Sequence, residues 1–292
     1  MNFVYFLHDE KSSESFERVL LKIRSKYNII SVPELYSCLK NGVKLRNTCC
    51  LTVDDGWRST YDVIFPVIKR HKIPITIFVS PESCVNGFNF WFYLYKYCDK
   101  ETLMKRVIEK GFFDHKITKY SLELALKELE IDTVYSLISH NLDYNHKNKK
   151  IERGFVNIQE LLEMRDSGLV TIGAHTLTHP ILSNETDERS KKEIVNSITQ
   201  LAKLLNQPVE YFAYPNGLPN IDFGMREIEF VKEAGIKMAF SVESNYITRN
   251  VNFYSVPRIF SEKRLDLGRL GVLLPSLSNQ KGKRKEIKKL KQ

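Results

Sequence analysis

Residues 49–56 read Cys-Cys-Leu-Thr-Val-Asp-Asp-Gly, an apolar run of strand length that ends in two carboxylates and a glycine. Such a run is typical of a buried strand, and Gly56 allows a sharp turn after it. Asp54 and Asp55 are therefore expected at the carboxyl end of a strand, where one acid can bind a metal and the other can act as a base. By itself the pair is a weak signal, because acid-glycine sequences are also common in structural turns.

Strands and helices alternate on both sides of this segment. We expect strands at 3–7, 49–53, 75–79, 170–172, 209–213 and 238–241, and helices at 12–27, 32–39, 59–70, 158–167, 187–205 and 223–234. This alternation predicts an α/β fold with a parallel sheet, either open or closed into a barrel. In both arrangements functional residues belong at the carboxyl ends of the strands.

The stretch at about 81–153 breaks the alternation, being first rich in aromatic residues and then helical and polar. We interpret it as an insertion within one domain spanning 1–275, which a basic tail at 276–292 follows. Trp91 is the candidate in this stretch for stacking on a sugar ring, with Phe92, Tyr93 and Tyr95 close to it in the sequence. The alternative is that these rings pack in a core, as most aromatic side chains do.

The composition is that of an ordinary globular protein, with 292 residues, 42% apolar and 27% charged. No apolar run approaches the ~20 residues that cross a bilayer, and Asp9 and Glu10 come too early for a signal peptide, so we expect a cytoplasmic protein. The five cysteines are odd in number and lack a C-x-x-C spacing, which argues against a disulfide framework or a cysteine zinc site.

The net charge of +9 is concentrated at the end of the chain. Between 281 and 292 there are seven lysines and arginines against one glutamate, which gives +6 and leaves +3 elsewhere. Such a tail can contact an anionic membrane peripherally at its inner face, because each cation near anionic lipid contributes about 1 kcal/mol. A solvated end without a partner is the alternative, and nucleic acid is the least favoured partner because the body is only mildly basic.

A second polar motif follows the expected strand at 170–172. It reads His175-Thr-Leu-Thr-His179 and so places two imidazoles four residues apart, where they can ligate one ion. A histidine pair of this spacing also arises by coincidence on surfaces. Together with one carboxylate, however, two histidines form the ligand set of catalytic zinc sites and leave a position open for water and substrate. Zinc is the expected cofactor, with other divalent ions still open.

These motifs resemble those of the polysaccharide deacetylases, also called the NodB-homology family or carbohydrate esterase family four. Residues 51–56 are similar to the T-F-D-D-G motif, and 175–179 to the H-S/T-x-x-H motif. Residues 73–79 (I-P-I-T-I-F-V) resemble I-P-A-T-F-F-V, and 212–217 (F-A-Y-P-N-G) resemble F-A-Y-P-Y-G. The resemblance covers most of the chain apart from the insertion and the tail.

The resemblance implies a distorted, seven-stranded (β/α) barrel. It also implies that Asp55, His175 and His179 are metal ligands and that Asp54 is the general base. The implied function is the removal of an N-acetyl or N-formyl group from an amino sugar in a surface-polysaccharide, glycolipid or related glycoconjugate pathway. Which sugar, acyl group and carrier are used remains open at this point.

The family's late L-x-H motif, whose histidine protonates the departing amine, is absent because no histidine follows His179. Instead, Phe6-Leu7-His8-Asp9 ends the first expected strand and resembles this motif moved to the amino terminus, as in circularly permuted members. We therefore expect His8 to be the general acid, since an imidazole titrates near neutral pH. The alternative is an imidazole that only caps or packs at the end of a strand.

Ala213 stands where many members of the family carry the arginine of R-x-P-Y, which orients the base. Arg258 and Arg58 are the candidates to replace it, although each also fits an ordinary salt-bridge arginine. For the loop of Tyr214, Pro215 and Asn216, the resemblance implies that a backbone N–H near Asn216 helps to bind the oxyanion.

These departures from the family pattern leave a second reading open. The chain can be a carbohydrate-binding pseudoenzyme of the same fold that keeps the metal and lacks turnover.

Overall fold

The computed structural model describes residues 1–113, 117–118, 121–142 and 151–260. Its described residues divide into two compact units, one formed by 1–88 and 153–260 and one formed by those between 89 and 152. The expected basic tail at 276–292 lies outside the described residues. Among the helices of the described ranges, none is both long and apolar enough to cross a bilayer.

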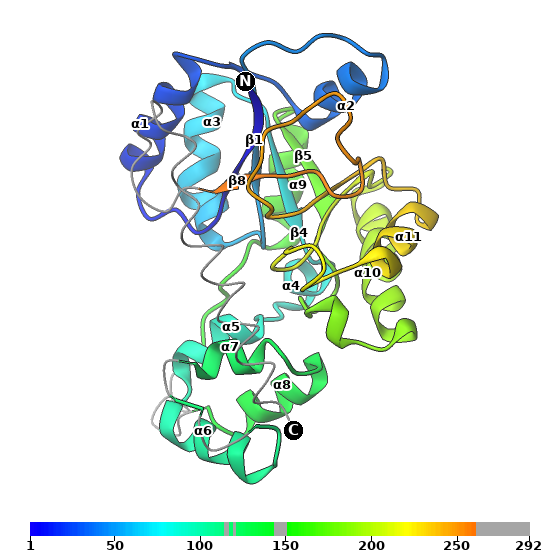
Figure 1. Ribbon diagram of the computed structural model, residues 1–292. Coiled ribbons are helices and arrows are strands. Elements are labelled where there is room, and N and C mark those ends of the chain that lie inside the picture. The colour runs from blue at the N-terminus through cyan, green and yellow to red at the C-terminus, as the bar shows by residue number, and fades with distance from the viewer. Residues whose placement is uncertain (114–116, 119–120, 143–150, 261–292) are drawn as a thin grey trace. The chain divides into compact units, whose positions relative to one another are not determined.

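The first unit is built on a parallel sheet (Figure 1). Seven strands form one continuous path in the order β7-β6-β5-β4-β3-β1-β8, and β2 pairs with β3 outside this path. The path leaves β7 and β8 as its two edges, as in a distorted (β/α) barrel, which confirms the expected fold class. The bounds of the strands are β1 Asn2–Leu7, β2 Asn28–Ile29, β3 Thr48–Val53, β4 Ile75–Val79, β5 Val170–Ala174, β6 Tyr211–Ala213, β7 Met238–Phe240 and β8 Ile259–Phe260.

Helices connect the strands of the first unit, and polar caps set where several of them begin. The side chains of Ser12, Ser31, Asn157 and Thr186 each accept a hydrogen bond from a backbone N–H three residues later. The predicted helix at 59–70 begins as a π-helical turn before it becomes regular. The bounds are α1 Ser13–Arg24, α2 Val32–Lys40, η1 Thr60–Ile64, α3 Phe65–His71, α4 Pro81–Asn86, α9 Ile158–Asp166, η4 Leu182–Asn184, α10 Asp187–Leu205 and α11 Met225–Glu233.

The central strands β3 and β4 are buried at every position. Their near-continuous apolar sequences reflect this, because a parallel strand covered on both faces has no solvent side. The register pairs Leu7 with Val53, and Val79 with Ala174. The residues that follow β1, β3 and β5 therefore leave the sheet at the same edge, which places the two polar motifs together.

The second unit is helical and has an apolar core of its own. It contains α5 Trp91–Leu94, η2 Tyr95–Tyr97, α6 Lys100–Glu109, α7 Leu122–Leu126 and α8 Ile131–Ser139. Trp91 is 2% exposed and lies in this core, and its backbone N–H donates to Tyr135 Oη at 3.1 Å. A buried indole presents no open face to a sugar, so the expectation that Trp91 contacts substrate is wrong. Packing, the alternative, explains its position.

Candidate active site

The candidate site lies at the carboxyl ends of β1, β3 and β5. Leu7 and Val53 are paired, so His8 and Asp54 are the next residues on adjacent strands. The backbone N–H of His175 donates to Val79 O at 3.0 Å, which continues the pairing of β4 and β5 by one residue. The sheet thus brings together three segments that are far apart in the sequence.

Asp55, His175 and His179 form a buried cluster whose ligand atoms all lie within 4.8 Å of one another. Asp55 Oδ1 is 3.3 Å from His175 Nε2 and 3.2 Å from His179 Nε2. His175 Nδ1 donates to the carbonyl of Ala213 at 2.7 Å, so in a neutral ring the Nε2 that faces Asp55 carries the lone pair. Two electron-pair donors that face each other at this distance fit a shared cation.

A second observation on Asp55 agrees with a cation at this point. Its Oδ1 is buried and accepts no hydrogen bond from any residue that the structure describes. Its Oδ2, by contrast, accepts a hydrogen bond from Trp57 Nε1 at 3.0 Å and lies 2.7 Å from His8 Nε2. The two carboxylate oxygens therefore have separate partners, and Oδ1 is the one available to a metal.

Burial and charge set the protonation of these ligands. Burial raises the pKa of Asp55, but the imidazoles of His8, His179 and His175 outweigh it and hold that pKa well below its usual range. Burial lowers the pKa of His179. Asp55 is therefore an anion and His179 is biased toward the neutral imidazole, which are the forms that bind a metal.

The backbone of both motifs adopts a left-handed conformation that non-glycine residues rarely take. Asp55 has φ of 68°, and Thr176 and His179 have φ of 63° and 59°. Gly56 also has positive φ, and a Cβ on it would lie 2.8 Å from Val79 Cγ1. Such conformations cost about 1–3 kcal/mol each and cluster at functional sites, although Lys72 and Asn206 adopt them at helix ends.

His8 lies at the exposed side of the cluster, with 41% of its side chain accessible to solvent. Its ring meets the ring of Trp57 edge-on, with centroids 5.5 Å apart. Desolvation lowers the pKa of His8, but the Asp55 carboxylate outweighs this effect and raises the pKa above its usual value. His8 is thus next to the metal ligands and open to solvent.

Arg258 fixes the second acid of the motif. Its Nη1 and Nη2 donate to Asp54 Oδ1 and Oδ2 at 2.7 and 2.8 Å, and the guanidinium is fully buried. The Nε of Arg258 donates to Ser241 O at 2.9 Å, which fixes the guanidinium plane. The other candidate, Arg58, pairs with Asp62 and Glu160 and does not contact Asp54.

The loop after β6 supports the site through packing. The ring of Tyr214 is buried and stacks on Phe223 with centroids 3.7 Å apart, and its hydroxyl donates to Tyr254 O. Pro215 is buried as well. Asn216, with φ of 55°, is partly exposed, and it is the residue of this loop that can approach a substrate. Tyr214 and Pro215 therefore support the loop, and a role of Asn216 in oxyanion binding stays a prediction.

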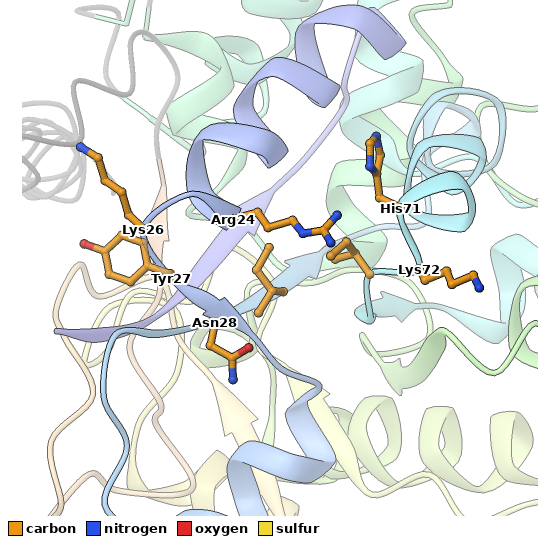
Figure 2. A pocket seen from close by; sticks show the side chains of 8 residues that line it. Arg24, Lys26, Tyr27, Asn28, His71 and Lys72 are labelled. Carbon is orange, nitrogen blue, oxygen red and sulfur yellow. The ribbon is translucent and has the colours of Figure 1, made fainter.

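A separate pocket lies near the amino ends of β2 and β4 (Figure 2). It is lined by Arg24, Lys26, Tyr27, Asn28, Ile29, His71, Lys72 and Ile73. Figure 2 shows the side chains of Lys26 and Lys72 pointing away from each other. Two of the cationic lining residues lie at helix C-termini, Arg24 at the end of α1 and Lys72 just after α3. Positive charge at these ends complements the helix dipole. The pocket shares no lining residue with the cluster at the carboxyl ends.

A family model described as polysaccharide deacetylase matches residues 42–115 and 113–239, which is more than half of the chain. This chain belongs to the polysaccharide deacetylase family. The matched ranges contain both motifs of the candidate metal site, strands β3 to β6 and the first two residues of β7. His8 and Arg258 lie outside the matched ranges, directly after β1 and directly before β8.

The chain is also similar to individual members of this family. It is 24% identical over 276 residues to the poly-beta-1,6-N-acetyl-D-glucosamine N-deacetylase of Staphylococcus aureus strain MSSA476, covering 88% of this chain and 72% of the relative. Its fold matches the Streptococcus pyogenes deacetylase PplD, with a TM-score of 0.59, 16% identity and coverage of 89% and 91%. IcaB from Ammonifex degensii gives a TM-score of 0.58 at 17% identity, with the same coverage.

Sequence reasoning missed Trp57, which donates to Asp55 and contacts His8. The available signal was its position directly after the acid-acid-glycine motif. A side chain at this position is only two residues from Asp55 and can reach its carboxylate. Isolated tryptophans are usually core residues, however, and Trp57 does also pack against Phe155 with ring centroids 4.9 Å apart.

Proposed function

We propose that this chain is a metal-dependent hydrolase that removes the N-acetyl group from an amino-sugar polymer. The observation that carries the proposal is the pairing of a buried Asp55, His175 and His179 cluster with an adjacent, rigidly held Asp54. Membership of the polysaccharide deacetylase family supports it. The names of the Staphylococcus aureus relatives support a polymer of N-acetylglucosamine as the substrate class.

Asp55, His175 and His179 would hold the metal. One carboxylate and two imidazoles suit zinc, and other divalent ions with nitrogen and oxygen ligands are compatible. When bound, such an ion polarises the amide carbonyl and makes a bound water more acidic. Two features of this chain fit such an ion: Asp55 Oδ1, which accepts no hydrogen bond from the described residues, and His175 Nε2, which faces it.

Asp54 is the proposed general base. Each of its oxygens accepts one hydrogen bond from Arg258 and keeps further lone-pair capacity for a proton. Because Arg258 is buried and held by Ser241 O, Asp54 is fixed in one orientation while it takes a proton from the attacking water. Arg258 acts through Asp54 and is a positioning residue.

His8 is the proposed general acid. Its Nε2 lies 2.7 Å from Asp55 Oδ2, at the solvent-exposed side of the cluster. As the C–N bond of the amide breaks, His8 gives a proton to the departing amine nitrogen, while the carbonyl carbon keeps the oxygen gained from water. The products are acetate and the free amino sugar.

The pseudoenzyme reading has two motivations, the loss of the arginine at Ala213 and the displaced acid. Against the first, Arg258 makes a two-point contact with Asp54 from the segment before β8. Against the second, His8 Nε2 lies 2.7 Å from Asp55 Oδ2. We therefore favour the enzyme.

Acetate release from N-acetylglucosamine oligomers tests the proposal. We expect release by the zinc-loaded protein, loss of release after chelation, and recovery when zinc is added back. Asp54→Asn should lower release by about 100-fold or more, because general base catalysis contributes 10²- to 10⁴-fold. Release that survives both chelation and Asp54→Asn would contradict the proposal.

A further inference from the structure

The segment between the two histidine ligands is a short loop under backbone strain. Thr176 and His179 have positive φ, and the Thr176 side chain accepts from the His179 N–H at 3.1 Å. The backbone of Leu177 and Thr178 lies between them, and neither residue belongs to the candidate ligand set. The distance between the two imidazoles therefore depends on the contacts that fix the peptide groups of Leu177 and Thr178.

Glu193 of α10 holds these peptide groups. Its Oε2 accepts from the backbone N–H of Leu177 and from that of Thr178, each at 2.9 Å. Its Oε1 accepts from Thr178 Oγ1 at 2.7 Å. On the other side of the loop, Ser80 Oγ donates to the carbonyl of Leu177. The loop is thus fixed from both directions, by one helix and by the end of one strand.

The burial of Glu193 indicates that this contact is specific. The side chain is 1% exposed, and a buried carboxylate is costly unless hydrogen bonds compensate it. Three donors come from the ligand loop, and Arg189 Nη2 lies 3.2 Å from Oε1. Most of the compensation for this buried charge therefore comes from the segment that joins His175 to His179.

We propose that Glu193 is a positioning residue of the metal site, whose carboxylate sets the spacing of His175 and His179. The inference rests on the proposed function in taking Asp55, His175 and His179 as the ligands. Outer partners that orient metal ligands typically contribute about 10- to 100-fold to metal affinity. Glu193 makes its contribution through the backbone of the loop, without touching either imidazole.

Zinc affinity, measured by competition with a chromophoric chelator, tests this role without any substrate. Glu193→Gln keeps the size of the side chain but replaces one acceptor oxygen by a donor, so we expect an affinity about 10- to 100-fold weaker. The absorption spectrum of the cobalt-loaded variant should also change, because the ligand geometry changes. Glu227→Gln is the matched control, since Glu227 is a buried glutamate that also contacts α10, through Ser190, and caps its own helix.

Glu227→Gln should lower the melting temperature and keep the zinc affinity within about threefold of the wild-type value. The reason is that Glu227 shares no hydrogen-bond partner with Glu193. If Glu193→Gln does not fold, Thr178→Val tests the proposal in its place, because it removes only the hydroxyl that donates to Glu193 Oε1. We expect the zinc affinity of Thr178→Val to be about 3- to 10-fold weaker than that of the wild type. Unchanged affinity and an unchanged cobalt spectrum in the folded variants would overturn the proposal. A wild-type protein that binds zinc but releases no acetate would contradict the proposed function and not this inference.

Discussion

Arg258 and Asp54 are 204 residues apart in the sequence and form a two-point ion pair, with N to O distances of 2.7 and 2.8 Å. The pair is buried, and the guanidinium also lies over the ring of Phe6, 4.4 Å from its centroid. Ala213 leaves the usual arginine position of the family empty, and Arg258 provides the cation from the segment before β8. Asp54, the proposed base, is therefore held in one orientation by a residue that directly precedes β8.

Arg258→Lys should lower kcat by about 10- to 100-fold with little change in KM, because an ammonium ion cannot make the two-point contact that orients Asp54. Steady-state kinetics on N-acetylglucosamine oligomers measure this split. Arg258→Ala should destabilise the fold by about 3–5 kcal/mol, since it leaves a buried carboxylate unpaired. Arg58→Lys is the control, because Arg58 is the other candidate arginine and forms partly exposed ion pairs with Asp62 and Glu160. A kcat for Arg258→Lys equal to that of the control would refute the positioning role.

His8→Gln should lower kcat by about 10²- to 10⁴-fold, which is the usual contribution of a general acid. Zinc affinity should fall much less than kcat, because Trp57 Nε1 still donates to Asp55 Oδ2 and because His175 and His179 face Oδ1. The measurement is turnover together with zinc affinity on one preparation. An activated acetanilide, whose amine leaves more easily, should be less sensitive to the substitution. Equal sensitivity for both substrates would rule out the acid role.

Trp57→Phe should weaken zinc affinity by about tenfold, because it removes the indole N–H that fixes Asp55 Oδ2 and keeps an aromatic ring in place. Chelator competition measures the affinity, and the melting temperature of the metal-free protein reports the packing. Loss of stability without loss of affinity would show that Trp57 serves only the core.

Gly56→Ala should destabilise the protein by about 1–3 kcal/mol more than Gly42→Ala, as expected of an overpacked site. Both glycines have positive φ, 66° and 68°, so both alanines carry the same backbone strain. Only at Gly56 does the added Cβ meet a neighbour, Val79 Cγ1 at 2.8 Å, whereas nothing lies within 4 Å at Gly42. Urea unfolding of the two variants measures the difference, and equal midpoints would contradict it.

The elements that carry the strongest patterns were predictable from the sequence. β4 at Ile75–Val79 and α10 at Asp187–Leu205 have the expected bounds. In β4 an uninterrupted apolar run defines the strand. In α10 the cap of Thr186 and the left-handed Asn206 define the two ends. Local signals of this kind fix an element without any knowledge of its neighbours.

Contacts between distant segments were less predictable. Two arginines were candidates to hold Asp54, and only the register of β1 with β3 and β8 selects Arg258. The burial of Trp91 depends on helices of the second unit that share no motif with the site. Glu193 lies in the amphipathic helix α10, and the residues around it in the sequence do not indicate that it binds the backbone of Leu177 and Thr178. The cytoplasmic location and the membrane contact of 276–292 stay predictions.

The central claim is that one cation binds Asp55, His175 and His179 beside Asp54. An anomalous difference map from a zinc-loaded crystal, recorded at the zinc absorption edge, tests it most directly. We predict a single peak at about 2.0–2.2 Å from Asp55 Oδ1, His175 Nε2 and His179 Nε2, the distances usual for zinc with these ligands. A peak elsewhere in the molecule, or zinc bound without Asp55, would contradict the account.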